Sequence, residues 1–324
     1  MKNENNFAPV FSLRFLQALI VHMRPYLLFV SGAAGLAGLA LGWQENSSIT
    51  KFVILFLPFF LGYGFGQALT DCFQTDTDAI SASYRPLVKK EVSPKALGGV
   101  SLAGLVIIGI PLILYNLNNL IFCSLAIIGL ATYTYFKKNF WIAGPFYNGW
   151  IVMILPITAF LAVTGKDLSI LNNSTLIWLC VITLFSYANF VLIGYLKDIT
   201  ADRETGYNTF AVKFGWDHSV VLGDIFVIII ALASLFLINP ENIIAFALFI
   251  IATFVAVSGQ LKAHFTSIKI EENATYPIVS TVRAFILWHL AMMITFQPNW
   301  YLFALCYYIV FELVLLFRPE KGQI

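Results

Sequence analysis

Charged residues are scarce in this sequence. Lys, Arg, Asp and Glu make up 11% of its 324 residues, whereas a soluble globular domain carries about 25%. A chain of this length could bury a large core, but it has too few polar residues to cover one in water. The formal net charge of +2 is also small, so the composition gives no support to a nucleic-acid partner.

Cysteines are few as well, and none forms a CxxC pair. Cys72, Cys123, Cys180 and Cys306 each lie in or beside an apolar run, where a free thiol behaves as a small hydrophobic side chain. This excludes a disulfide scaffold and a cysteine-ligated zinc site. Long linkers are also missing, and the polar N-terminus predicts no cleavable signal peptide. We therefore expect a single domain over residues 1–324.

Long apolar runs, in contrast, fill most of the chain, which is 59% hydrophobic. Runs of about 20 residues with few charges cross a bilayer as helices. A membrane β-barrel would instead show alternation in segments of about ten residues. The sequence predicts an all-α integral membrane protein with ten helical segments. Their approximate ranges are 16–43, 50–75, 94–115, 119–136, 142–164, 174–196, 218–238, 242–262, 277–296 and 299–317.

Lys and Arg are distributed unevenly between the two sides of such a bundle. If the N-terminus is cytoplasmic, fifteen of them lie on the cytoplasmic side and two, Lys51 and Lys166, on the other. This positive-inside pattern predicts a bacterial inner membrane protein whose connections at about 70–93 and 197–217 face the cytoplasm. The fifteen are Lys2, Arg14, Arg85, Lys89, Lys90, Lys95, Lys137, Lys138, Lys197, Arg203, Lys213, Lys262, Lys269, Arg318 and Lys321.

Three aspartates end the second apolar segment, in the stretch "QALTDCFQTDTDAISASYRP" at residues 67–86. Carboxylates at the end of a membrane helix are functional candidates unless they are only solvated caps. If the helix continues through this stretch, Asp76 projects away from Asp71. Four other residues then share one helical face at i, i+4, i+7 and i+11: Gln67, Asp71, Gln74 and Asp78.

A second acidic stretch, "GYLKDITADRETGYNTFAVKFG" at residues 194–215, follows the sixth segment. Asp198 and Asp202 are one helical turn apart, and Lys197 and Arg203 flank them. Two carboxylates at this spacing suit a hard cation such as Mg²⁺, which takes oxygen ligands and keeps waters that a phosphate can replace. The alternative is a solvated connection with ion pairs between neighbouring turns.

The two acidic stretches lie at the same end of the bundle, because both follow even-numbered segments. Carboxylates that face one another repel unless a cation lies between them. We therefore predict a site for Mg²⁺ and a diphosphate at the mouth of an apolar cavity. The apolar bundle beneath would hold a hydrophobic chain.

The chain resembles the UbiA-type intramembrane prenyltransferases over about residues 20–240. In that family the first motif reads NDxxDxxxD and is followed by RP, and here Asp78 precedes "RP" at 85–86. The second motif, DxxxD followed by R and a later FG, is matched by Asp198, Asp202 and "TFAVKFG" at 209–215. Weaker matches are "HMRP" at 22–25 and "YTYFKK" at 133–138. Aligned on Asp78, the first motif departs from the family at two positions, with Thr70 in place of Asn and Gln74 in place of Asp.

The resemblance implies nine to ten transmembrane helices around a central apolar cavity and a magnesium-dependent prenyltransferase. It would move a polyprenyl group from an allylic diphosphate to a lipophilic acceptor within the lipid. The residues implied as catalytic are Asp71, Asp78, Asp198 and Asp202, and these four with Gln74 are the implied Mg²⁺ ligands. Those implied for diphosphate binding are Arg24, Arg85, Lys137, Lys197 and Arg203, and those for the substrate cavity are Gln67, Gln74, Tyr133 and Asn148.

Two other functions stay open at this stage. A terpene cyclase of the same fold would capture the allylic cation with a double bond of its own chain, and the departures at Thr70 and Gln74 leave room for it. A transporter would place charges near mid-span and show an internal repeat, neither of which stands out here. The identity of the acceptor and the length of the prenyl chain are not encoded in any motif.

Overall fold

The computed structural model describes residues 7–318, and all regular secondary structure in this range is helical. Within it, ten helices are long and apolar enough to cross a membrane, which confirms the predicted all-helical membrane bundle. The α-helices are α1 (Leu13–Met23), α2 (Leu28–Gly42), α3 (Ile49–Asp71), α4 (Thr75–Ser81), α5 (Pro94–Tyr115), α6 (Asn119–Asn139), α7 (Ala143–Thr164), α8 (Ser174–Gly194), α9 (Ile199–Glu204), α10 (Phe210–Leu235), α11 (Ile243–Phe265), α12 (Thr275–Phe296) and α13 (Tyr301–Leu316). The 3-10 turns are η1 (Pro25–Leu27), η2 (Leu168–Asn172), η3 (Tyr195–Lys197), η4 (Glu271–Ala274) and η5 (Pro298–Trp300).

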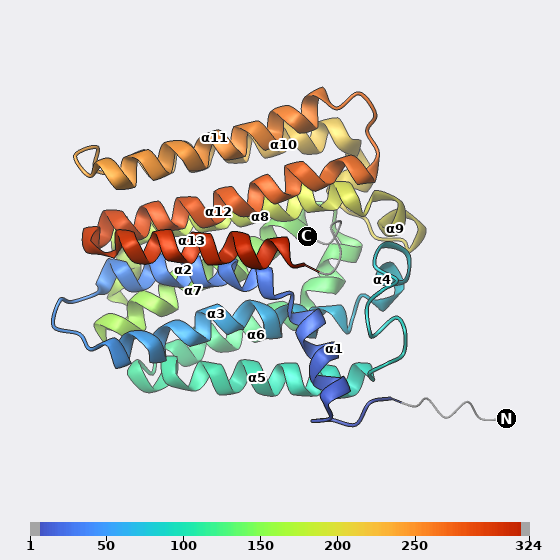
Figure 1. Ribbon diagram of the computed structural model, residues 1–324, viewed down its shortest axis with the longest axis horizontal. Helices are drawn as coiled ribbons and strands as arrows, with labels where there is room; N and C mark the ends of the chain where they lie inside the picture. Colours follow the sequence, from blue (N-terminus) through green and yellow to red (C-terminus); the bar gives the residue numbers. More distant parts are fainter. Residues whose placement is uncertain (1–6, 319–324) are drawn as a thin grey trace.

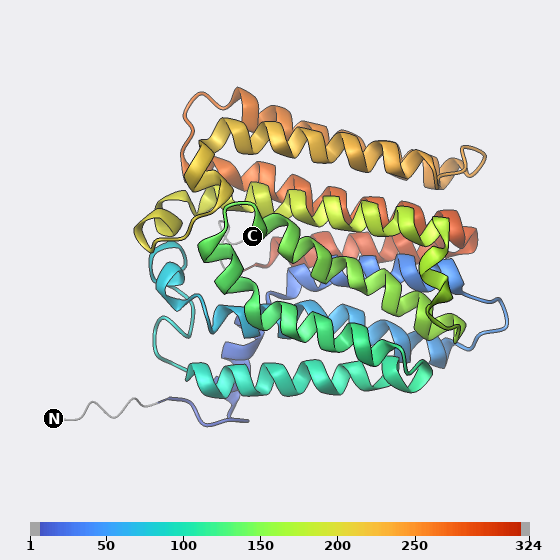
Figure 2. The same ribbon diagram turned by 180° about the vertical axis from the view of Figure 1, so that it is seen from behind.

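The long helices run side by side, and their centre is formed by α2, α7, α8 and α12 (Figures 1 and 2). α12 packs against α2, α8 and α11, while α2 also packs against α3 and α7. In the most apolar window of α12, 89% of the residues are buried, compared with 22% in α5 and in α13. The outer helices therefore present their apolar side chains to lipid, as expected for a membrane bundle.

The first predicted segment, 16–43, is not one helix. It breaks at Arg24, which adopts a left-handed conformation with φ 49° and ψ 73°, and Pro25 then begins η1. Proline has no N–H to donate and disfavours the helical conformation in the residue before it. As a result α1 turns away from α2 and crosses the end of the bundle (Figure 1).

The second predicted segment, 50–75, also ends earlier than expected. α3 stops at Asp71, a turn follows, and a separate short helix, α4, begins at Thr75. The continuous helix assumed for residues 67–78 is therefore wrong, although its two ends remain close in space. The seventh span, predicted from residue 218, starts at Phe210 and kinks at Gly215, whose φ of 80° is a conformation that glycine adopts without strain.

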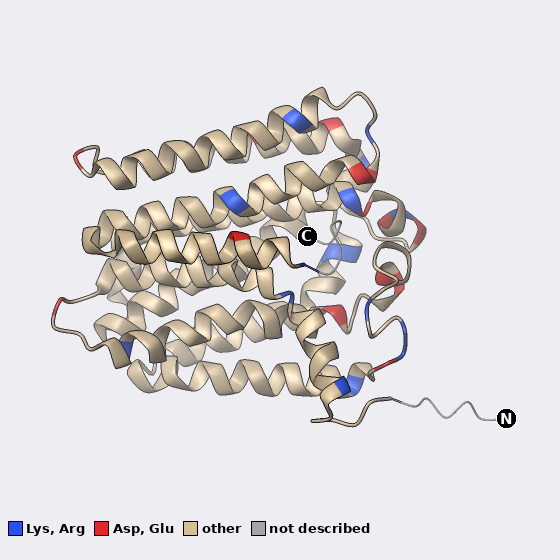
Figure 3. Cartoon of the chain, viewed as in Figure 1, with Lys and Arg blue, Asp and Glu red and all other residues tan. Residues whose placement is uncertain are grey.

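Most of the charged residues lie toward one end of the bundle (Figure 3). The connection from α3 to α5 and the connection from α8 to α10 both lie at this end (Figures 1 and 2). Lys51 lies at the opposite end, where its ammonium group donates to the carbonyl of Val163 at 3.0 Å. Two of the cytoplasmic cations counted from the sequence, Lys2 and Lys321, lie outside the described residues.

An ion pair joins α12 and α13, the last two spans that the structure describes. Arg283 of α12 donates to Glu312 of α13 through Nε at 2.7 Å and Nη2 at 2.6 Å, and Tyr308 adds a hydrogen bond at 2.8 Å. Charges at this depth need partners because lipid cannot solvate them. The pair therefore fixes α13, the tenth span, against the rest of the bundle.

Candidate active site

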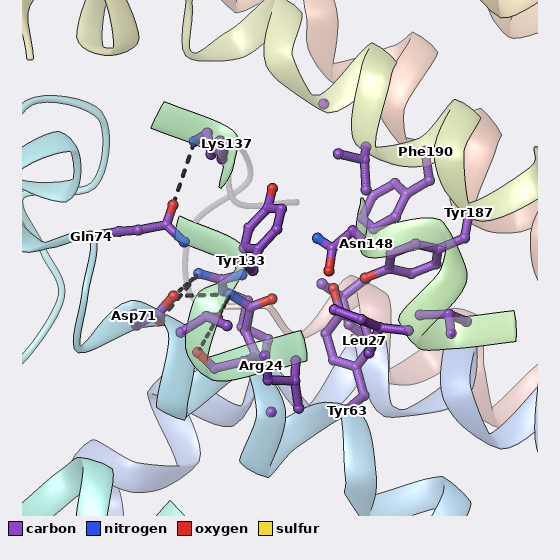
Figure 4. Close-up of a pocket in the computed structure, with 18 of the residues that line it drawn as sticks. Arg24, Leu27, Tyr63, Asp71, Gln74, Tyr133, Lys137, Asn148, Tyr187 and Phe190 are labelled. Carbon is purple, nitrogen blue, oxygen red and sulfur yellow. Dashed lines mark hydrogen bonds and ion pairs between the residues drawn. The ribbon is translucent and has the colours of Figure 1, made fainter. Parts of the chain in front are cut away.

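A cavity of about 250 Å³ opens at the charged end of the bundle. Its walls come from α3, α6, α7 and α8, from η1, and from the two aspartate-bearing connections. Polar side chains, among them Asp71, Gln74 and Lys137, line one part, and Leu27 and Phe190 belong to the more apolar part (Figure 4). The cavity thus joins an ionic region to a space for a hydrophobic group.

Asp71 ends α3 and is 1% exposed. Arg24, at the break between α1 and η1, donates through Nη2 to both carboxylate oxygens, at 3.0 and 3.2 Å. Gln67 Nε2 donates to Asp71 Oδ1 at 2.9 Å, and Arg85 Nη1 lies 3.5 Å from Oδ1. The sequence placed Arg24, Arg85 and Asp71 in one site, and the structure brings these three together.

Asp78 lies on α4 and faces the same cavity as Asp71, in spite of the helix break between them. Its carboxylate forms an ion pair with Arg85, and its exposure is only 6%. Burial raises the pKa of Asp78 to about 6, and the nearby Arg85 works against this shift. Asp71 and Asp78 therefore share Arg85 as a counter-charge.

Lys137, at the end of α6, connects the two motifs. Its ammonium lies 3.2 Å from Asp202 and donates to the amide oxygen of Gln74 at 3.4 Å. It also lies over the rings of Tyr195 and Tyr207, at 5.1 and 4.9 Å from their centroids. This one cation therefore contacts residues from both aspartate-bearing connections.

The second motif divides its two carboxylates between different surroundings. Asp198 caps the start of α9 and lines the cavity together with Lys197. Asp202 is 0% exposed and does not line the cavity, and burial raises the pKa of its carboxyl while Lys137 opposes the shift. Arg203, predicted to bind diphosphate, is exposed on α9 and lies outside the cavity lining.

Asp76 does not join the other carboxylates. It pairs with Lys138 at 3.3 Å and accepts a hydrogen bond from Tyr207 at 3.2 Å, with its side chain 46% exposed. Partial burial raises the pKa of Asp76, but hydrogen bonds from the Thr77 N–H and Lys138 more than offset it, so the net shift is downward. The separation of Asp76 from Asp71 agrees with the sequence argument, although the helix break produces it.

The residues predicted for the substrate cavity all line it: Gln67, Gln74, Tyr133 and Asn148. The Tyr133 hydroxyl lies 2.9 Å from that of Tyr195. Asn148 lies near Tyr63 and Tyr187, whose hydroxyl groups point toward each other (Figure 4). Sequence reasoning missed these last two tyrosines, because an aromatic residue in an apolar run looks the same whether it faces lipid or a cavity.

His22 is a second omission, and its signal lay in "HMRP". It is 1% exposed at the end of α1, and its Nδ1 lies 2.9 Å from Asp71 Oδ2. The sequence interpretation used Arg24 from this motif and left His22 aside. In the sequence, the available signal was a polar side chain two residues before the predicted site residue Arg24.

The site contains donors that no group of the described residues satisfies. The Nε atoms of Arg24 and Arg85 are buried and have no hydrogen-bond acceptor among the described residues. Both arginines line the cavity. A bound anion with several oxygens, such as a diphosphate, would satisfy such guanidinium donors. Within residues 7–318, no three His, Cys, Asp or Glu side chains come close enough to hold a metal ion by themselves.

Comparison with known proteins adds an independent finding. The model of the UbiA prenyltransferase family matches residues 31–274. A digeranylgeranylglyceryl phosphate synthase from Thermococcus sibiricus is 27% identical over 226 residues, which cover 68% of this chain and 76% of the relative. Another from Methanothrix thermoacetophila is 26% identical over 220 residues, which cover 67% of this chain and 78% of the relative.

Two solved structures share the fold. A UbiA homologue from Aeropyrum pernix K1 superposes with a TM-score of 0.68 at 16% identity, over 80% of this chain and 94% of its own. A UbiA homologue from Archaeoglobus fulgidus, solved with GPP and Mg²⁺, superposes with a TM-score of 0.60 at 18% identity, over 85% of this chain and 99% of its own. Both agree with the helical bundle predicted from the sequence.

Proposed function

Because the chain belongs to the UbiA prenyltransferase family, we propose that it transfers a polyprenyl group from an allylic diphosphate to a lipophilic acceptor. The observation that carries this proposal is a cavity inside a membrane bundle that joins an ionic region to an apolar one. Four cations line the ionic region beside Asp78 and Asp198: Arg24, Arg85, Lys137 and Lys197. A prenyl diphosphate has the same division into an anionic head and a hydrophobic chain.

Magnesium fits the residues of the first and second motifs. Four of the five predicted ligands line the cavity with an oxygen-bearing side chain: Asp71, Gln74, Asp78 and Asp198. The fifth, Asp202, is buried and pairs with Lys137. Mg²⁺ is commonly held by one or two carboxylates together with phosphate oxygens and water. The fold of the Archaeoglobus fulgidus homologue that binds GPP and Mg²⁺ supports the same metal here. When bound, the ion would supply positive charge next to the diphosphate.

The protein's own cations would also stabilise the negative charge of the diphosphate. Arg24 and Arg85 have unsatisfied Nε donors beside the cavity, and Lys137 and Lys197 line its wall. As the allylic C–O bond ionises, negative charge develops on the leaving diphosphate, and fixed cations in a water-poor site stabilise it. The acceptor then bonds to the allylic cation and loses a proton, which the released diphosphate can take up, so no protein nucleophile is required. Arg203, which lies outside the cavity, would contribute only to the potential at its entrance.

The two relatives named above point to one class of acceptor. Both are digeranylgeranylglyceryl phosphate synthases, so we place a prenylated glyceryl phosphate first among the acceptors to be tested. The cyclase alternative gains no support from these relatives. An acceptor-free reaction separates the two, because a cyclase needs only the prenyl diphosphate.

The purified protein in lipid should convert geranylgeranyl diphosphate and geranylgeranylglyceryl phosphate to a doubly prenylated product in the presence of Mg²⁺. Mass spectrometry of the lipid extract identifies that product. Parallel reactions with an aromatic acid or a quinone precursor test other acceptors, and a reaction without acceptor tests cyclisation. Release of diphosphate in none of these reactions would refute the proposed activity.

We also propose that residues 1–324 form one membrane domain whose charged end faces the cytoplasm across the cytoplasmic membrane. The Lys and Arg asymmetry supports this orientation, whereas the archaeal relatives give no support to a bacterial source in particular. Ser83 is exposed in the connection between α4 and α5. A cysteine placed there, in a protein without its native cysteines, should react with an impermeant thiol reagent only after the inner face is exposed.

A further inference from the structure

His22 makes two hydrogen bonds that fix the position of its proton. The backbone N–H of Leu87 lies 3.4 Å from Nε2, and this N–H can only donate. Nε2 is therefore the acceptor, so the proton of the neutral ring sits on Nδ1 and is donated to Asp71 Oδ2, 2.9 Å away. Through this ring, α1, α3 and the connection after α4 are held in one arrangement.

The carboxylate of Asp71 is fully occupied by protein donors. Its Oδ2 accepts from His22 at 2.9 Å and from Arg24 at 3.2 Å. Its Oδ1 accepts from Arg24 at 3.0 Å and Gln67 at 2.9 Å, with Arg85 at 3.5 Å. A carboxylate offers about four lone-pair positions. Since Asp71 is 1% exposed, a metal ion could reach it only by displacing one of these donors.

We infer that Asp71 anchors the diphosphate-binding arginines instead of binding metal, and that His22 is the positioning residue that holds this anchor in place. The inference rests on the proposed function, because it assigns the arginines to the diphosphate. Asp71 takes the Nη2 donor of Arg24 and approaches Nη1 of Arg85, which leaves both Nε donors unsatisfied beside the cavity. Mg²⁺ would then depend on the remaining oxygen ligands of the two motifs.

The backbone at Arg24 gives independent support. Arg24 is one of three non-glycine residues with positive φ among those described, at φ 49°. A residue with a Cβ adopts this conformation at a cost, and such strain persists where surrounding contacts impose it. The double contact with Asp71, itself held by His22, is such a contact. In this conformation Arg24 lines the cavity and contacts Asp71.

The second motif repeats the arrangement with a different cation. Asp202 is 0% exposed, is absent from the cavity lining and pairs with Lys137 at 3.2 Å, while its partner Asp198 lines the cavity. In each motif a buried carboxylate thus holds a cation, although in the first motif Asp71 and Asp78 both line the cavity. Among residues 7–318 no histidine pairs with Asp202, and His22 lies before residue 31, where the family match begins.

The test compares two amide substitutions, each of which keeps one of the two hydrogen bonds of His22. His22→Asn places its amide nitrogen near the position of Nδ1 and keeps the donor to Asp71. His22→Gln reaches the position of Nε2 and keeps the acceptor for Leu87. Binding of inorganic diphosphate to the purified protein is measured by calorimetry in excess EDTA, so that only protein cations contribute. Steady-state rates with geranylgeranyl diphosphate follow at several Mg²⁺ concentrations.

We expect His22→Gln to weaken metal-free diphosphate binding about tenfold, the scale of one lost hydrogen bond to a charged group. Its KM for geranylgeranyl diphosphate should rise by a similar factor, while the Mg²⁺ concentration for half-maximal rate stays within about twofold. His22→Asn should remain close to wild type. Gln67→Leu, which removes another donor from the same carboxylate, should shift binding in the same direction and tests the anchor if His22→Gln fails to fold.

Two results would overturn the inference. Equal diphosphate binding in His22→Asn, His22→Gln and wild type would show that the bond to Asp71 positions nothing. A large rise in the Mg²⁺ requirement of His22→Gln with unchanged metal-free binding would make Asp71 a metal ligand. His264→Leu breaks a His–Asp contact away from the cavity, with Asp224 at 2.7 Å between α10 and α11, and serves as the control. Absence of prenyl transfer in wild type would refute the proposed function alone, since the metal-free binding needs no turnover.

Discussion

The connection from α3 to α5 and the connection from α8 to α10 each carry two motif aspartates, but they surround them differently. In the first, Asp71 is held by two arginines and a histidine. In the second, a single lysine pairs with Asp202. The first motif also has Gln74 where the family has aspartate, so it gathers more cations and lacks one carboxylate of the family pattern. The difference suggests that the first motif mainly binds diphosphate and the second contributes relatively more to holding metal.

Removing magnesium should have the largest effect of all. The motif carboxylates are negative and cannot supply the positive charge of the ion, and the leaving diphosphate needs that charge. In excess EDTA we expect turnover to fall below detection and to return when Mg²⁺ or Mn²⁺ is added. Diphosphate release, followed by a coupled assay, measures this. Full turnover in chelator would show that neither motif acts through a bound metal ion.

Asp202→Asn comes next, because it leaves Lys137 buried without its counter-charge. A buried charge that loses its partner is strongly destabilising, and Lys137 also contacts Gln74 of the first motif. We expect the rate to fall about 100-fold or more, the scale seen when one key electrostatic group is removed. Steady-state kinetics and thermal unfolding are measured together. Asp217→Asn, which breaks the exposed pair with Lys269, is the control and should keep wild-type activity.

A comparison of Asp71→Asn with Asp76→Asn tests which of these two carboxylates near the first motif the reaction needs. Asp71 is buried among four donors, so its substitution should lower the rate at least tenfold. Asp76 pairs with Lys138 with both side chains over 40% exposed, at 46% and 42%, and an exposed pair contributes little, so the loss should stay within about fivefold. The ratio of the two kcat/KM values is the measurement. If Asp76→Asn is the more damaging, the turn after α3 must rearrange to bring Asp76 to the metal.

Much of this architecture could be predicted from composition and spacing. Ten spans, the charged end and the meeting of both motifs follow from hydrophobic runs and from the even number of helices between the motifs. Asp71, Asp78, Asp198, Arg24 and Arg85 line one cavity, and the roles assigned to them stay predictions. These features depend on local patterns that a chain must carry to enter a membrane at all.

The breaks in the helices were harder to predict. "MRP" contains a proline that permits a break at Arg24, but the turn after Asp71 contains neither glycine nor proline. Its position coincides with contacts to residues 47 and 49 positions earlier in the chain, Arg24 and His22. A local pattern cannot report contacts at such separations, which is also why His22 was overlooked. Asp202 and Asp198 look equivalent in sequence for the same reason, although only Asp198 lines the cavity.

The smallest expected effect comes from giving the first motif the carboxylate it lacks. Gln74 lines the cavity and accepts from Lys137 at 3.4 Å. Gln74→Asp would place a negative charge beside that lysine and the metal, so the rate should stay within about threefold, since an opposite charge lies close enough to stabilise the new one. The Mg²⁺ concentration for half-maximal rate should fall, and a magnesium titration measures it. Gln74→Asn, equal in length but neutral, is the control. If Asn lowers the magnesium requirement as much as Asp, side-chain length and not charge separates the two motifs at this position.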